Sequence, residues 1–326
     1  MRFCCFCKGH STGNSVLTSA CMKTIKNWFG LIKKAGAEFF TDNAMKLSAS
    51  LSYYTIFSLG PMLLVIMSFA GIFFGKDAVQ GTLYREIRGL IGNEAALQIQ
   101  DIIAGIQHSQ QGVTGAIIGI GILLLGATGV FNEIQSSINY IWSIRAKPKK
   151  GWLKLLINRL ISFSLVLSCS FILMVSLIVN AVIELLNDQL KTHFPHITLV
   201  VFHVINLFTI FVVIAALFAI IFKVLPDANI RWRDARVGAS FTAVLFMAGK
   251  FLIGFYLGTS NLGLTYGTAA SLIIILLWVY YSSIILYFGA EFTKVYAINR
   301  GAGIVPAKTA VFIIKQEAKE IGETRL

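Results

Sequence analysis

Charged side chains are scarce in this chain of 326 residues, of which only 13% are Asp, Glu, Lys or Arg. Soluble domains carry about twice that share. Hydrophobic residues make up 56% of the sequence, and the mean hydropathy is +0.75. This balance excludes a soluble globular domain and favours a protein embedded in a membrane.

Motifs of common catalytic sites are also missing. The sequence contains no HExxH zinc pair, no GxSxG nucleophile elbow and no phosphate-binding loop. No base is paired with Cys169 to activate it as a nucleophile. Four of the five histidines lie outside the long apolar stretches (His10, His108, His193 and His196). We therefore expect no enzymatic activity and no metal or other cofactor.

Cysteines are few, and four of the five lie in the first 21 residues (Cys4, Cys5, Cys7 and Cys21). They lack the matching downstream Cys/His pair of a zinc site, and no apolar run precedes Cys21 as in a lipoprotein signal. In a cytoplasmic segment they would stay free thiols. We interpret residues 1–22 as a disordered, Cys-containing cytoplasmic extension. Translation from Met22 is the alternative.

What the chain does have is six long apolar stretches. A helix needs about 20 apolar residues to cross a hydrocarbon core, and an isolated strand would leave its backbone unpaired there. The sequence therefore predicts an all-α, polytopic membrane protein with six transmembrane helices. The stretches are Leu47–Phe74, Val113–Trp142, Leu160–Leu186, Thr198–Leu225, Val237–Leu257 and Ala269–Ile298.

Positive charge alternates along the connections between these stretches. Of the 28 Lys and Arg residues, 23 lie in or beside the N-terminal segment, the second and fourth connections and the C-terminal tail, whereas four lie in the other three connections. The positive-inside rule then predicts that both termini are cytoplasmic and that the protein lies in the bacterial inner membrane. The net charge of +13 suits anionic lipid headgroups, and no nucleic-acid partner is expected.

Two segments beside the spans have amphipathic patterns. Residues 23–46 are predicted to form an interfacial helix on the cytoplasmic leaflet, with Trp28 on its apolar face. Residues 75–112 are predicted to form a periplasmic helical hairpin between the first two spans, with Asn93 capping its second helix. The hairpin would cap a cavity, dock a partner or stabilise the bundle. Residues 47–298 make up the membrane domain, and residues 299–326 the cytoplasmic tail.

Unusual groups inside spans are the first candidates for function, because a charge in hydrocarbon is costly. Lys250, in the outer half of the fifth span, would bind a phosphate or another anion entering from the bilayer. Alternatively, its ammonium group extends to the outer headgroups. Gly60 and Pro61 interrupt the first span, where a kink would either line a cavity or serve packing alone.

Two carboxylates form a second candidate site. Glu133 and Glu291 lie in the inner thirds of the second and sixth spans. Together they would carry protons or hold a cation. Alternatively, each would form a structural ion pair with a nearby base (Lys46, Arg145 or Lys294).

Several clusters of residues together resemble the YihY/BrkB family of six-helix bacterial inner-membrane proteins. They extend from about residue 30 to residue 298, and their order and spacing carry the assignment more than any single cluster does. The clusters are Ala49–Tyr54 with Ser58–Pro61, Ser137–Trp142, Leu225–Asp227 with Trp232, Ala248–Lys250 with Tyr256, and Tyr266–Gly267 with Leu277–Tyr280 and Gly289–Glu291. The cysteine-rich start falls outside the resemblance.

The resemblance implies a role with envelope lipids. Family members have carried the labels of ribonuclease and virulence factor, and this sequence offers no catalytic constellation for the first. The leading hypothesis is transport or handling of an amphipathic anion, foremost an envelope phospholipid or related lipid. The candidate substrate-binding residues are Lys250, Gly60, Pro61, Tyr53 and Tyr266.

Two other functions stay open. The first is a non-transporting scaffold for a lipid-transport assembly, which would dock an envelope protein through residues 75–112. The second is a proton- or cation-coupled solute carrier that uses Glu133 and Glu291. The substrate, the direction of transport, the energy source and the oligomeric state are open at this level.

Overall fold

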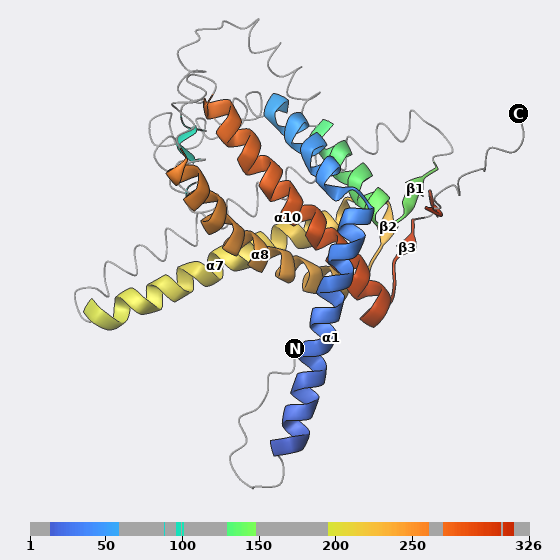
Figure 1. Ribbon diagram of the computed structural model, residues 1–326, viewed down its shortest axis with the longest axis horizontal. Helices are drawn as coiled ribbons and strands as arrows, with labels where there is room; N and C mark the ends of the chain where they lie inside the picture. The colour runs from blue at the N-terminus through green and yellow to red at the C-terminus, as the bar shows by residue number, and fades with distance from the viewer. Residues whose placement is uncertain are drawn as a thin grey trace, which may run out of the picture.

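The computed structural model describes residues 14–58, 88, 96–98, 100, 129–147, 195–260, 270–307 and 309–315. Side chains are described from residue 27 onward within these ranges, apart from 195–203 and 271. The labelled elements are α1 (Asn14–Thr41), β1 (Ile144–Ala146), α7 (Pro195–Val224), β2 (Ala228–Asn229), α8 (Trp232–Thr259), α10 (Ala270–Arg300), β3 (Val305–Pro306) and β4 (Ala310–Phe312) (Figure 1). Residues 44–58 and 129–141 are also helical. The described part of the chain is mostly helical, as the sequence predicts.

Three described helices are long and apolar enough to cross a membrane. They are Val204–Val224, Trp232–Thr259 and Leu272–Arg300, with 21, 28 and 29 residues. Their outer surfaces carry exposed aromatic side chains such as Phe208 and Phe255, which suits contact with lipid. These helices contain most of the last three predicted spans.

The other predicted spans are described only in part. The structure describes the first to residue 58 and the second from residue 129, and the third lies outside the described residues. So does the predicted hairpin 75–112, apart from residues 88, 96–98 and 100.

The chain changes direction between α1 and the first span. Asn43 has a φ of 52°, in the left-handed region, which asparagine tolerates better than most residues. Helix α1 therefore ends at Thr41, earlier than the boundary of 46 that the amphipathic pattern predicts. It begins at Asn14, so its first turns fall within the segment 1–22, for which the sequence analysis expects disorder. The break leaves Asp42 facing the end of α10, where it contacts Lys294.

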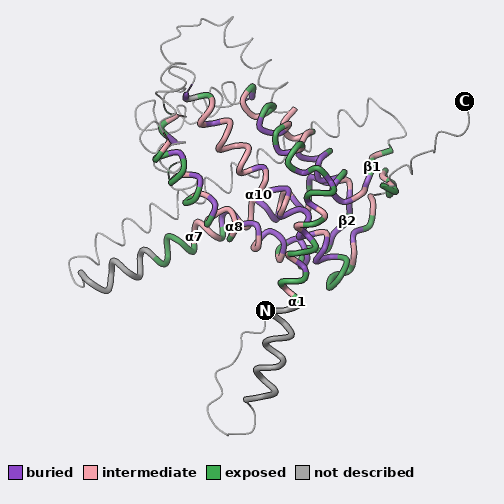
Figure 2. The backbone as a smooth tube through the Cα atoms, viewed as in Figure 1, coloured by how far each residue is buried: buried purple, intermediate pink, exposed green. Residues whose placement is uncertain are grey.

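Helix α1 packs along α10 instead of resting on lipid alone. Trp28 stacks on Phe292 with ring centroids 5.9 Å apart, and Phe39 meets Phe288 edge-on at the same separation. Leu31 joins the buried cluster around Phe292. The apolar face predicted for this segment is thus largely covered by protein. Figure 2 shows the buried residues gathered where α1, α8, α10 and the strands meet.

Helices α8 and α10 cross at small residues. A Cβ added at Gly238 would collide with the Thr293 side chain, and one added at Gly289 would collide with Thr242. Each threonine donates its hydroxyl to the carbonyl of the glycine one turn before it, Thr242 to Gly238 and Thr293 to Gly289. The two glycine–threonine pairs therefore face each other across antiparallel helices. Small residues at such crossings allow backbones to approach closely inside membranes.

Replacing Gly238 with alanine is expected to destabilise the protein by about 1–3 kcal/mol, because the new methyl group overlaps Thr293 in a packed contact. Thermal unfolding of the purified full chain in detergent micelles measures the effect. The matched control is Gly36→Ala in α1, where a Cβ meets nothing within 4 Å and alanine favours the helix. An unfolding temperature for Gly238→Ala at or above that of Gly36→Ala would contradict the close crossing.

Short strands join two connections and the tail at one end of the helices. Strand β1, which follows the helix 129–141, pairs antiparallel with β4 of the tail, and β2, which follows α7, pairs antiparallel with β3 (Figure 1). The sequence predicts an all-α fold, so these strands are an addition to it. The tail also donates backbone hydrogen bonds to carbonyl groups of both connections that lie outside the helices. Ile313 donates its N–H to Ser143, and Ala307 donates its N–H to Asp227.

Candidate functional site

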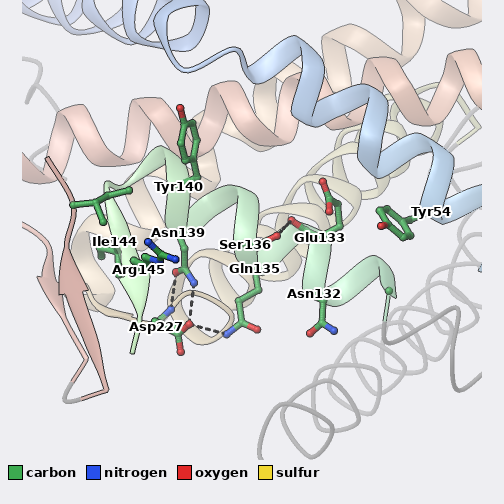
Figure 3. A pocket seen from close by; sticks show the side chains of 13 residues that line it. Tyr54, Asn132, Glu133, Gln135, Ser136, Asn139, Tyr140, Ile144, Arg145 and Asp227 are labelled. Carbon is green, nitrogen blue, oxygen red and sulfur yellow. Dashed lines mark hydrogen bonds between the residues drawn. The ribbon is translucent and has the colours of Figure 1, made fainter. Parts of the chain in front are cut away.

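Two side chains of the helix 129–141 form hydrogen bonds with Asp227, in the turn after α7. Asn139 donates its amide to the Asp227 carboxylate at 2.9 Å and accepts the backbone N–H of Asp227 at 2.9 Å. Gln135 donates to the same carboxylate oxygen at 3.3 Å (Figure 3). The backbone carbonyl of Asp227 accepts the N–H of Ala307 from the tail at 2.9 Å. Asp227 thus joins the second span, the fourth connection and the tail.

This junction forms one end of a cavity of about 740 Å³. Figure 3 shows Arg145 beside Asn139 and Asp227 at that end, and Glu133 with Tyr54 at the other. Most of the wall comes from the helix 129–141 and β1, while Ile313 of the tail also contributes. The cavity therefore offers two carboxylates and a guanidinium group to an occupant. A volume of this size is typical of small-molecule sites.

A cluster of charged side chains lies where α1, α10 and the tail meet. Lys294 on α10 lies at its centre, with its Nζ atom 2.7 Å from Glu38 Oε2, 3.1 Å from Glu291 Oε2 and 3.5 Å from Asp42 Oδ2. Lys315 of the tail reaches Asp42 Oδ2 at 2.7 Å. We call these five residues the charge cluster. The Glu291 side chain is 0% exposed, that of Asp42 6% and that of Glu38 30%.

Several contacts place the charge cluster close to the cavity. The Nζ atom of Lys315 lies 4.0 Å from the ring centroid of Tyr140, which lines the cavity. Trp142, at the end of the same helix, donates its indole N–H to the carbonyl of Ala290 at 3.1 Å, next to Glu291. Lys294 itself lines a second cavity of about 420 Å³, which borders residues 301–304 at the start of the tail.

Among the described residues, three buried side-chain atoms have no hydrogen-bond partner. They are Ser137 Oγ, Tyr287 Oη and Glu291 Oε1. Ser137 on the helix 129–141 and Tyr287 on α10 are both buried. Glu291 follows Tyr287 by one helical turn, so both side chains lie on the same face of α10. Buried polar groups are rarely left unpaired, so these atoms are candidates for a role beyond packing.

The predicted site residues are therefore separated by the fold. Glu133 lines the cavity, and Glu291 belongs to the charge cluster with Lys294, one of the bases expected to pair with it. Lys250 lies on the outer half of α8 with its Nζ atom 5.5 Å from the Phe251 ring, and it does not line the cavity. Tyr53 is exposed next to Tyr54, whose ring centroid is 5.9 Å away. Gly60, Pro61 and Tyr266 lie outside the described residues.

Sequence reasoning missed most of the polar contacts. Asn139 and Asp227 appear in the resemblance only as motif members, yet each is the other's hydrogen-bond partner. Asp42 and Glu38 belong to the segment 23–46, whose apolar pattern predicted an interfacial helix, so these two carboxylates were not predicted as site residues. The available signal was the presence of acidic residues directly before a span, which is unusual beside so many basic ones.

The fold and site define a helical integral membrane protein with a polar cavity at the end of its helices. The sequence matches the family described as Virulence factor BrkB over residues 35–313, and the chain belongs to that family. This confirms the resemblance drawn from the motifs.

Curated relatives carry the name UPF0761 membrane protein. The one from Pseudomonas paraeruginosa is 27% identical over 259 residues, which cover 77% of this chain and 59% of the relative. The one from Rhodospirillum centenum is 28% identical over 268 residues, covering 81% and 56%. This chain thus spans about three fifths of the length of these relatives. No solved structure matches the chain.

Proposed function

We propose that the protein handles or transports a phospholipid or related envelope lipid, without enzymatic activity or a cofactor, and that the cavity binds the headgroup. The observation that carries this proposal is that Arg145, Glu133 and Asp227 line one cavity. A guanidinium group binds phosphate through two parallel hydrogen bonds. A carboxylate accepts hydrogen bonds from an ammonium group. The cavity therefore suits a headgroup that carries both, such as that of a zwitterionic phospholipid.

An aromatic surface beside the cavity supports a lipid occupant. Tyr53 and Phe57 are exposed on the helix 44–58, with ring centroids 4.9 Å apart, and Tyr54 contributes to the cavity wall. Amphipathic rings favour the boundary between headgroups and acyl chains. The glycerol region of a lipid would lie along these rings while its headgroup enters the cavity.

The location of the cavity supports an orientation. The strands bring the second connection, the fourth connection and the tail to one end of the helices, and these are the segments rich in Lys and Arg. The positive-inside rule assigns that end to the cytoplasm. We propose that both termini are cytoplasmic, that the protein lies in the inner membrane, and that the cavity serves the cytoplasmic leaflet.

Among the other functions, a coupled carrier has support from the structure. Glu133 lines the cavity, and Glu291 lies in the charge cluster. Ion coupling is compatible with lipid handling, so it would be part of the same cycle. A scaffold that binds an envelope protein depends on residues 75–112, most of which lie outside the described residues.

Replacing Arg145 with glutamine is expected to weaken binding of the copurified lipid by about tenfold, because a charge-assisted hydrogen bond to phosphate contributes about 1.5–3 kcal/mol. Native mass spectrometry of the full chain, released from its own membranes, measures the lipid-bound fraction. Lys250→Leu is the control, since Lys250 does not line the cavity.

The outcomes of this experiment separate the hypotheses. Loss of the lipid in Lys250→Leu, with retention in Arg145→Gln, would move the headgroup site to the fifth span. A wild-type protein without any selectively bound lipid would count against lipid handling. A protein partner retained by all variants would favour the scaffold.

A further inference from the structure

The fully buried member of the charge cluster has the least compensation. Glu38 is paired with Lys34 at 4.0 Å as well as with Lys294, and Asp42 contacts both Lys294 and Lys315. Glu291 contacts Lys294 alone and shares it with the other two carboxylates. A poorly compensated charge away from water costs several kcal/mol, and a proton bound to Glu291 removes that charge.

Glu291 is the member best suited to hold that proton. Its side chain is fully buried, whereas the Glu38 carboxylate is partly exposed and Asp42 receives both lysines. One oxygen of Glu291 accepts from Lys294, and the other, Oε1, has no hydrogen-bond partner. A protonated Oε1 becomes a donor, and Asp42, which shares Lys294 with Glu291, supplies a carboxylate that can accept from it.

Two buried hydroxyls are the candidates for a route between Glu291 and the cavity. Tyr287 lies one turn before Glu291 on α10, and Ser137 lies one turn after Glu133, which lines the cavity, on the helix 129–141. Neither hydroxyl has a hydrogen-bond partner in the structure, so a proton passes only when side-chain motion brings these groups within hydrogen-bond distance of one another. A hydroxyl group donates one hydrogen bond and accepts others, so it can pass a proton on by accepting one and releasing one. Lys294, the lysine that contacts Glu291, also lines the second cavity, which borders residues 301–304 at the start of the tail.

We propose that Glu291 is a proton-binding site held by Asp42 and Lys294, and that Tyr287 and Ser137 connect it to Glu133 in the cavity. In the transfer, a proton leaves the Glu133 carboxyl group, Ser137 and Tyr287 each accept one proton and release one, and the Glu291 carboxylate becomes a neutral acid. No electron moves and no further reactant is needed. The coupling of this proton to an occupant of the cavity rests on the proposed function, but the proton site itself does not.

Infrared spectroscopy tests the site directly. The full chain is studied at neutral pH in maltoside micelles, whose detergent has no carbonyl group, after copurified lipid has been removed by detergent exchange, because the ester C=O stretch of a lipid would overlap that of a protonated carboxyl group. The wild type is expected to show such a band, and Glu291→Gln is expected to lose it. Glu38→Gln, which changes the most exposed carboxylate of the cluster, is the control and should retain the band. Identical spectra of wild type and Glu291→Gln would show a fully ionised, purely structural cluster and overturn the proposal.

Deuterium exchange tests the route. On transfer to D₂O, the carboxyl band shifts when the proton of Glu291 is replaced. Tyr287→Phe is expected to keep the band but to slow its shift at least tenfold, while Tyr296→Phe on the same helix leaves the rate unchanged. Equal rates in wild type and Tyr287→Phe would exclude the route through Tyr287. If the carboxyl band is absent while Arg145→Gln still loses its lipid, the proton site fails and the lipid site stands. If the band is present while Arg145→Gln keeps its lipid, the lipid site fails and the proton site stands.

Discussion

Replacing Lys294 with methionine is expected to lower the free energy of unfolding by about 3–5 kcal/mol, which is the usual cost of removing one partner from a buried ion pair. Lys294 contacts three carboxylates from two segments of the chain, and its side chain is 12% exposed. Methionine fills a similar volume but leaves Glu291 and Asp42 facing each other without the ammonium group between them. Equilibrium unfolding of the full chain in mixed detergent micelles measures the change.

A double variant separates charge from packing. Adding Glu291→Gln to Lys294→Met replaces the fully buried carboxyl group, which has lost its ammonium partner, with a side chain that is neutral at every pH, so the double variant is expected to be more stable than Lys294→Met alone. Lys33→Met, at an exposed position on α1, is the control for losing a lysine. Purely additive losses in the double variant would show that the two side chains do not interact.

The second large effect is expected at Asn139. Asn139→Leu removes two hydrogen bonds to Asp227, one of them to its carboxylate, and places an apolar side chain against that charge. Hydrogen bonds contribute about 0.5–1.5 kcal/mol when neutral and about 1.5–3 kcal/mol to a charged group, so a loss of about 2–4 kcal/mol is expected.

The same variant also reports on the tail. Because Asp227 accepts a hydrogen bond from Ala307, loosening this junction is expected to speed proteolysis between residues 301 and 315. Asn132→Leu, an exposed position on the same helix, is the matched control. Equal stability and equal proteolysis of the two variants would contradict a structural role for the Asn139–Asp227 contact.

Local patterns in the sequence predicted the helices well. Apolar runs near residues 198–225, 237–257 and 269–298 correspond to helices α7, α8 and α10. The ends were less accurate, as at Thr41, because a single residue in a left-handed conformation can stop a helix that its apolar pattern would continue. Strands of two or three residues leave no periodic signal, so β1 to β4 were not predicted.

The candidate site was predicted only in part. Glu133 and Glu291 stood out because a carboxylate in an apolar run is visible locally. Lys250 stood out for the same reason, yet the fold places it away from the cavity. Arg145, Asn139 and Asp227 lie at the ends of spans, where polar residues are common, so their types alone indicated nothing. Their role depends on contacts between residues separated by 80 or more positions.

The sequence by itself determined the class of this protein and which of its segments are apolar, because hydrophobicity and length decide whether a helix partitions into a membrane. Its motifs also determined the family. Only the tertiary structure decided which polar groups meet. The charge cluster joins Glu38 and Asp42 to Lys294 and Lys315, and the rotation and height of each helix in the packed bundle bring them together. Those are properties of helix packing, which no single stretch of sequence contains.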